Sequence, residues 1–272
     1  MPSDKRARQR ALRNQKLAIQ ERRAHRRRLG RRTISALVVV GFIIGLVVIL
    51  SNGSGKKTPA ASSSTTTTVA STTTTAAPIA PVCPPATAAG AAKRVIAFSS
   101  APPTCVAANS VFDATVKTDL GTFVFKMSTA TSPKAVNNFV FLARYHFYDG
   151  IIFHRVIPGF VVQGGDPTGT GSGGPGYSFT GNTPPSTCTA KGNCYATGDV
   201  ALANSGTPTS DGSQFFIVVP GGAGGLSDSY TVIGQVTSGM SVVNAIAKDG
   251  SSSGKPNKVH HMISVTIQQL SA

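Results

Sequence analysis

The chain has 272 residues, and its formal net charge of +16 comes mostly from one end. Thirteen of its 26 Lys and Arg residues lie within residues 1–32, beside only two acidic residues. From Val111 onward basic and acidic residues nearly cancel, which argues against a nucleic-acid-binding surface there. Glu21 is the only glutamate, and neither a Walker A nor a Cys-x-x-Cys motif occurs. These absences exclude glutamate-based acid–base enzymes, P-loop NTPases and thioredoxin-like enzymes.

Residues 33–50 form an apolar segment in which Ile34–Leu50 carries no charge. A helix of that length rises about 25 Å, so the segment predicts a transmembrane helix. A cleaved signal peptide is the alternative, but it would have a shorter basic lead-in and an Ala-x-Ala-like cleavage site. The preceding arginines predict that residues 1–32 form a cytoplasmic tail and that the C-terminal part lies outside the cell membrane. The tail could also bind anionic lipid or nucleic acid, but setting the orientation is enough to account for it.

Residues 51–82 are almost all Ser, Thr, Ala, Gly and Pro, which predicts a disordered linker. A cysteine-containing lead-in segment follows at residues 83–110. The four cysteines of the chain all lie beyond the apolar segment, so their even number predicts disulfides rather than a metal site. Three pairings are possible, and proximity favours Cys83 with Cys105 and Cys188 with Cys194.

Globular patterning begins at Val111, so residues 111–272 are the predicted folded domain. Alternation predicts strands at Val111–Val116 and Thr122–Lys126 around a turn at Asp119–Gly121. Ser132 as N-cap and Pro133 at the first helical position begin a predicted helix that is closed before Gly150. Its apolar residues at helical spacing are Val136, Phe139, Val140 and Ala143.

The C-terminal part predicts a second helix at Gly239–Lys248 and a last strand at Ile263–Leu270. Within that strand, alternation places Ile263, Val265 and Ile267 on one face. The remainder is short strands and Gly-rich turns. This pattern predicts a mainly β domain, either an antiparallel barrel or a sandwich, with two helices.

The densest stretch of candidate chemistry is Ile151–Asp166. A period of two places Arg155 on one strand face with Phe153 and Ile157, and later places Val161 on one face with Gln163. An arginine is thereby set among apolar side chains near an amide. The alternative is an arginine whose stem lies on the sheet while its head reaches solvent.

A second stretch comprises Val200–Gly206 and Gly212–Val218 and offers amide side chains beside two adjacent phenylalanines. Taken alone it is typical of a core strand with Phe216 buried and Gln214 bonded to backbone.

The segments FHRVIPGFVVQGGDPTGTGSGGPGY and ALANSGTPTSDGSQFFIVV resemble the two signature blocks of the cyclophilins, the peptidyl-prolyl cis-trans isomerases. The resemblance runs from about Val111 to Ile267. It implies a closed eight-stranded antiparallel β-barrel capped by two α-helices, and an activity that needs no metal or cofactor.

Carried over position by position, the resemblance implies that Arg155 is the catalytic residue. Gln163 would orient Arg155 and the substrate carbonyl, and Phe160 would be part of the apolar pocket for the substrate proline ring. The guanidinium would donate to the prolyl nitrogen of a twisted X-Pro amide. The resemblance assigns substrate binding to Val161, Gly171, Ala203, Asn204, Ser205, Gln214, Phe216, Leu226 and Tyr230.

Three positions depart from the best-known family pattern. Val161 stands where Met is frequent, and Tyr230 replaces a common His. Gly225 lies where cyclosporin-sensitive members carry Trp, so we expect weak cyclosporin binding because a large apolar contact with an N–H donor is missing.

Together these features predict a single-pass, membrane-anchored isomerase whose partners are proline-containing segments of secreted or envelope proteins. One alternative is a module of the same fold that holds proline-containing peptides without turnover. Another is an anchored scaffold whose function depends on its basic tail or on paired membrane helices.

Overall fold

The computed structural model describes residues 77–181, 194–206, 208–227 and 229–271. The predicted basic tail (1–32) and membrane helix (33–50), together with most of the predicted linker (51–82), lie outside the described residues. Among the residues that are described, no helix is long and apolar enough to cross a membrane.

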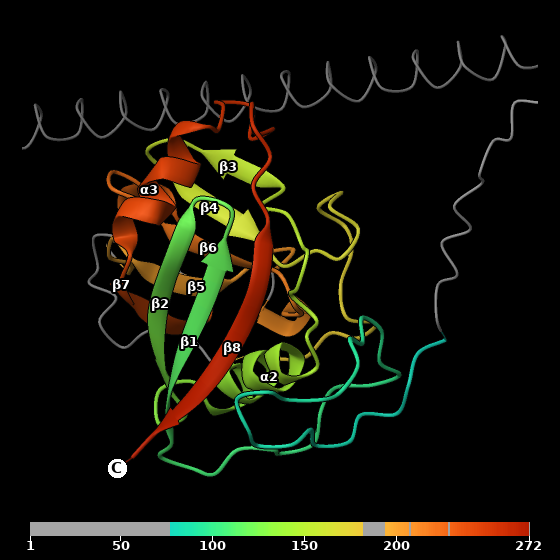
Figure 1. Ribbon diagram of the computed structural model, residues 1–272. Coiled ribbons are helices and arrows are strands. Elements are labelled where there is room, and N and C mark those ends of the chain that lie inside the picture. Colours follow the sequence, from blue (N-terminus) through green and yellow to red (C-terminus); the bar gives the residue numbers. More distant parts are fainter. Residues whose placement is uncertain (1–76, 182–193, 207, 228, 272) are drawn as a thin grey trace, which may run out of the picture. The chain divides into compact units, whose positions relative to one another are not determined.

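In these described ranges, eight strands form one antiparallel sheet in the order β3-β4-β6-β5-β7-β2-β1-β8. The predicted hairpin is confirmed as β1 and β2, which lie beside β8 as long neighbouring strands (Figure 1). The strands are β1 (Val111–Thr118), β2 (Gly121–Ser128), β3 (Arg155–Ile157), β4 (Val161–Gly164), β5 (Asp199–Leu202), β6 (Phe215–Val218), β7 (Val232–Ser238) and β8 (Met262–Leu270).

The sheet curls but does not close, so the predicted closed barrel is wrong. Its two edges are β3 and β8. In the described part of the chain, an isolated bridge between Ile152 and His261 and a backbone hydrogen bond from Phe153 N–H to the His260 carbonyl (3.0 Å) connect the segments that precede these strands. Among the described residues, no ladder joins β3, which is three residues long, to β8.

The last strand changes face in a way that simple alternation does not predict. Val265 and Ile267 are buried as expected, but Ile263 is 49% exposed and Met262 is buried instead. The register with β1 shifts at this point, which makes Ile263 the extra residue of a β-bulge. The predicted shared face of Ile263 with Val265 and Ile267 is therefore wrong.

Two α-helices are described, as the pattern predicts: α2 (Pro133–Arg144) packs against β8 and β2, and α3 (Met240–Lys248) packs against β2, β3 and β4. Ser132 is the N-cap position of α2, but its side chain does not cap the helix. Its hydroxyl instead donates to the Val232 carbonyl at 2.6 Å, which ties the start of the helix to β7.

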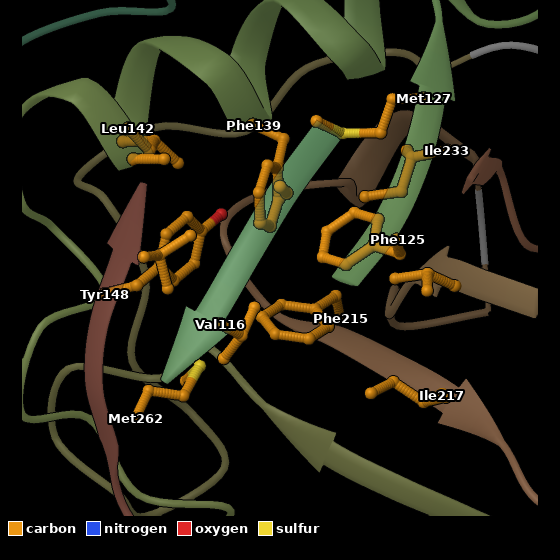
Figure 2. Close-up of a cluster of buried hydrophobic side chains, with 14 of the residues drawn as sticks. Val116, Phe125, Met127, Phe139, Leu142, Tyr148, Phe215, Ile217, Ile233 and Met262 are labelled. Atoms are coloured by element: carbon orange, nitrogen blue, oxygen red, sulfur yellow. The ribbon is translucent and has the colours of Figure 1, made fainter. Parts of the chain in front are cut away.

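The main hydrophobic core fills the space between the inner face of the sheet and α2 (Figure 2). The Phe139 ring stacks on the Tyr148 ring with centroids 4.7 Å apart and makes edge contacts with the rings of Phe125 and Phe215. Such aromatic contacts add to the free energy gained by burying apolar surface. The core therefore determines which side chains of each strand lie on the inner face of the sheet. The alternating side chains lie on the outer face and do not belong to this core.

The lead-in segment is packed onto the domain. The predicted Cys83–Cys105 disulfide is confirmed, and the side chain of Asn137 on α2 accepts a hydrogen bond from the backbone N–H of Cys105 at 2.7 Å. Phe98 is fully buried, with its ring against those of Phe141 and Tyr145.

The second predicted pairing, Cys188–Cys194, stays a prediction because Cys188 lies outside the described residues.

We expect the substitution Phe98→Ala to lower the free energy of unfolding by about 3–5 kcal/mol, because it removes a fully buried ring. Val82→Ala, at a 65% exposed position directly before the lead-in segment, is the control and should change the free energy of unfolding by less than about 0.5 kcal/mol. Urea unfolding measures both variants. A loss below about 1 kcal/mol for Phe98→Ala would mean that the lead-in segment is detached in solution.

Candidate active site

A row of four side chains crosses the outer face of the sheet over four neighbouring strands. Arg155 of β3 pairs with Gln163 of β4, Gln163 pairs with Phe216 of β6, and Phe216 pairs with Ala201 of β5. Cross-strand partners lie on the same face of a sheet, so these residues lie side by side. The alternating residues of the same strands enter the main core; they are Val156, Val162, Ile217 and Val200.

A chain of hydrogen bonds fixes the arginine head. Arg155 Nη1 donates to Gln163 Oε1 at 3.1 Å, and Gln163 Nε2 donates to Gln214 Oε1 at 3.0 Å. Gln214 Nε2 in turn donates to the carbonyls of Gly171 (3.0 Å) and Gly173 (2.9 Å). The backbone of a loop thereby determines, through two amides, the direction in which the guanidinium points.

A second apolar cluster lies on this outer face, separate from the main core. Val161 and Phe216 are among its buried members, and Phe160, Leu226 and Tyr230 are among the partly buried residues that pack against them. The rings of Phe216 and Tyr230 meet edge to face at 5.0 Å. The Arg155 guanidinium carbon lies 5.7 Å from the centroid of the Phe160 ring, so the cation borders the apolar cluster.

Sequence reasoning missed Tyr195, which holds Tyr230 in place. The Tyr195 hydroxyl donates to the Tyr230 carbonyl at 3.1 Å and accepts from the Tyr230 N–H at 2.9 Å. Both tyrosines lie in the second apolar cluster. No local pattern reveals this contact, because 35 residues separate the partners.

A cavity of about 360 Å³ lies beside the row and brings together six of the predicted site residues. Its walls come from the glycine-rich loop after β4 and from the segments on either side of η1 (Pro208–Ser210). The predicted residues that line it are Gln163, Gly171, Ala203, Asn204, Ser205 and Gln214. The other predicted residues belong to the second apolar cluster or, like Arg155, border it.

Asp166 organises the glycine-rich wall of this cavity, a role that the sequence did not indicate. Its carboxylate accepts hydrogen bonds from the N–H groups of Thr168 (2.7 Å), Gly171 (2.6 Å) and Gly173 (3.1 Å), and from the Thr168 hydroxyl (2.8 Å). Burial alone would raise the pKa of Asp166, but these hydrogen bonds to the charged form hold it below its ordinary value. The sequence signal for this role is an aspartate directly before a Gly- and Thr-rich loop, whose backbone N–H groups it can bind.

Phe153 does not share a face with Arg155, so that prediction is wrong. Phe153 lies in the main core because the alternation of buried and partly exposed residues over 151–154 shifts by one residue between His154 and Arg155, where β3 begins. Next to it, His154 is half-buried and lies close to Gly171. Burial lowers the pKa of the His154 imidazole, which favours its neutral form.

The core-strand alternative for the second stretch is correct in its details. Phe216 is 3% exposed, and Gln214 is bonded to backbone carbonyls. Both side chains nevertheless lie on the outer face or at the cavity, because the residues that enter the main core from this strand are Phe215 and Ile217.

Comparison with known proteins identifies the family. Residues 113–268 match the family model described as "Cyclophilin type peptidyl-prolyl cis-trans isomerase/CLD". The chain belongs to this family. It is a cyclophilin-type peptidyl-prolyl cis-trans isomerase.

Two relatives illustrate the similarity. Peptidyl-prolyl cis-trans isomerase B of Bacillus subtilis is 46% identical over 118 residues, which cover 43% of this chain and 76% of the relative. An isomerase of Schizosaccharomyces pombe is 42% identical over 127 residues, which cover 47% of this chain and 79% of the relative.

A crystal structure of a cyclophilin-type isomerase of Cryptosporidium parvum superposes with a TM-score of 0.51 at 29% identity, covering 59% of this chain and 99% of that one. The same protein in the presence of the dipeptide Ala-Pro gives a TM-score of 0.50 at 30% identity, covering 57% of this chain and 98% of that one.

This cyclophilin has a second cavity, of about 460 Å³, between its lead-in segment and α2. None of the predicted site residues lines it. Part of its wall comes from residues 101–108, which precede the family match.

Gly225, the position expected to weaken cyclosporin binding, lies in η2 (Ala223–Gly225) against the ring of Phe160. Weak cyclosporin binding itself stays a prediction.

We expect Asp166→Asn to lower the free energy of unfolding of this cyclophilin by about 2–3 kcal/mol at pH 7. The NH₂ group of the asparagine would face N–H groups whose hydrogen bonds the carboxylate now accepts. Since the pKa of Asp166 is depressed by folding, its contribution is complete above about pH 4 and is lost as the pH falls through the folded-state pKa. Calorimetric melting at several pH values measures the difference between variant and wild type, which should shrink below about pH 4.

The control for this measurement is Asp113→Asn on β1, where one carboxylate oxygen is buried without a hydrogen-bond partner in the described part of the chain. It should cost little. An Asp166→Asn variant as stable as wild type at pH 7 would contradict the role given to the carboxylate.

Proposed function

We propose that Arg155 accelerates X-Pro isomerisation by donating a hydrogen bond to the prolyl nitrogen of the twisted amide. Rotation about a peptide bond has a barrier of about 18–20 kcal/mol because resonance stiffens the C–N bond. At the twisted geometry the resonance is lost and the nitrogen lone pair can accept a hydrogen bond. A guanidinium aimed at that nitrogen stabilises the twisted form more than either planar form, which lowers the barrier.

The observation that carries this proposal is the hydrogen-bonded chain from Arg155 through Gln163 to Gln214 beside the second apolar cluster. An arginine that merely reached solvent would not need its direction fixed by a loop backbone. Preorganised donors cost no reorganisation when the transition state forms. The chemistry takes place at Arg155 and calls on no metal or cofactor.

The second apolar cluster is the proposed seat of the substrate proline ring. Its surface members Phe160, Leu226 and Tyr230 are partly buried, so they present apolar surface beside the guanidinium. The related structure obtained in the presence of Ala-Pro supports a proline-containing ligand for this fold. In our proposal the residues that precede the proline extend along the neighbouring cavity, against Ala203, Asn204 and Ser205.

The proposed clients are proline-containing segments of secreted or envelope proteins, with the domain held outside the cell membrane by residues 33–50. The apolar segment with arginines ahead of it supports this placement. The Cys83–Cys105 disulfide also supports it, because disulfides persist mainly in oxidising compartments.

In intact cells an added protease should cleave the domain while sparing the basic tail. A domain that stays protected until the cells are lysed would contradict the proposed location.

We expect Arg155→Ala to lower kcat/KM for an X-Pro peptide by about 10²–10³-fold while leaving the fold intact, because one preorganised donor is removed. Arg155→Lys keeps the charge but not the rigid set of donors, so it should lose most of the activity as well. NMR exchange spectroscopy on the full-length protein measures the rate.

Arg94→Ala is the control, because the Arg94 guanidinium donates to the backbone carbonyls of His146 and Phe147, neither of which lies at the site. This variant should keep the wild-type kcat/KM. Wild-type rates for Arg155→Ala would refute the mechanism. Peptide binding by wild type without acceleration would instead support the alternative of a peptide-holding module.

A further inference from the structure

A fully buried carboxyl group lies beneath the rim of the cavity, at Asp211. Its Oδ1 accepts a hydrogen bond from Asn204 Nδ2 at 3.2 Å, and its Oδ2 accepts one from the Thr231 hydroxyl at 2.8 Å. The backbone carbonyl of Asp211 accepts a third, from the Phe179 N–H at 2.9 Å. One residue thus joins the segment after β5, the start of β7 and the end of the glycine-rich wall.

Asn204 connects Asp211 to the rim of the cavity, by which we mean residues 203–206. Besides bonding to Asp211, its Nδ2 donates to the Ser229 carbonyl at 3.0 Å, and its Oδ1 accepts from the Gly206 N–H at 3.0 Å. The Asn204 side chain is therefore committed to the protein's own framework. Because the Asn204 side chain is hydrogen-bonded through both its Nδ2 and its Oδ1, it fixes the backbone of the 203–206 segment beside the cavity.

Among the described residues, the groups around the Asp211 carboxyl are neutral. The groups that face it in the described part of the chain are the Asn204 amide, the Thr231 hydroxyl and the backbone at Gly181, where a Cβ atom would collide with Oδ2. Burial raises the pKa of Asp211 to about 6, although the hydrogen bonds from Thr231 and Asn204 oppose this shift. The proton is therefore gained or lost within the range in which enzymes are usually assayed.

We propose that Asp211 is a positioning residue of the peptide groove, whose ionised carboxylate holds Asn204 and the 203–206 rim in the peptide-binding conformation and whose protonation weakens peptide binding. The inference rests on the proposed function, because it takes this rim as the part that holds the peptide backbone.

The hydrogen-bond chemistry determines the direction of the effect. The Asn204 NH₂ group can only donate, so a proton on Asp211 must lie on Oδ2, where it can be donated to the Thr231 hydroxyl oxygen. Both hydrogen bonds survive but become bonds between neutral groups. Charge-assisted hydrogen bonds are roughly twice as strong as neutral ones, so the tether on Asn204 weakens on protonation.

Asp211→Asn reproduces the protonated state at every pH. Its amide oxygen can accept from Asn204 while its NH₂ donates to Thr231, in nearly the same volume. The variant should fold and gain stability above about pH 6. A folded-state pKa raised by burial means that the ionised wild-type group costs stability there, and this cost disappears as the pH falls.

The test is the Kd of a proline-containing peptide, measured by NMR titration of the full-length protein at pH 7.5 and pH 5. Wild type should bind about three- to tenfold more weakly at pH 5, the difference expected between a charge-assisted and a neutral hydrogen bond. Asp211→Asn should show the weaker affinity at both pH values. In exchange measurements at saturating peptide, kcat should be unchanged, because Arg155 is not disturbed.

Asp199→Asn is the matched control, since burial also raises the pKa of Asp199, whose partners are the Ala196 N–H and Gln235. The Kd of this variant should change between pH 7.5 and pH 5 by the same factor as that of wild type. His154, which lies close to Gly171 in the cavity wall, is present in every variant, so any contribution of its titration to the change in Kd persists in Asp211→Asn.

Two results would overturn the proposal: a wild-type Kd that does not change between pH 7.5 and pH 5, or an Asp211→Asn variant that retains the full change. The Kd needs no turnover, so a failure of the arginine mechanism would appear in the exchange rates of Arg155→Ala and leave this test valid.

Discussion

The cross-strand register of β3, β4, β6 and β5 is the constraint on which the candidate site depends. It places Arg155, Gln163 and Phe216 in one row on the outer face. A shift by one residue in any of these strands would turn the row into the main core and expose core residues. The aromatic core under the sheet therefore stabilises the site indirectly, because the packing of Phe215 and Ile217 on the inner face determines that Phe216 lies on the outer face.

Two apolar clusters on opposite faces of the sheet explain how a small β domain can both fold and keep apolar surface partly exposed. The inner cluster is covered by α2 and provides the stability. The outer cluster remains partly exposed at Phe160, Leu226 and Tyr230, next to a cation. Exposed apolar surface usually has a function, since a contiguous patch of this kind invites association. In this isomerase it lies beside the Arg155 guanidinium, whose direction is set by Gln163 and Gln214.

Two aspartates hold the walls of the cavity by opposite electrostatic means. Asp166 is surrounded by N–H and O–H donors, so its charged form is favoured and the glycine-rich wall is held at all ordinary pH values. Asp211 is buried among neutral groups, so its charged form is costly. One wall is thus insensitive to pH, while the other responds to it. This asymmetry follows from the number of hydrogen-bond donors that each carboxylate receives.

The sequence by itself determined the local elements and the family: the first hairpin, both helices and the Cys83–Cys105 pairing all follow from periodicity, turn chemistry, proximity or resemblance. Only the tertiary structure decided what depends on contacts between distant segments. The sheet stays open between β3 and β8, and Met262 replaces Ile263 in the core because a bulge forms against β1. Likewise, the roles of Asp211 and Tyr195 depend on partners that lie 20 and 35 residues away on other segments. A local pattern reports which face a residue prefers, but hydrogen-bond partners and register are set by the packing of the whole chain.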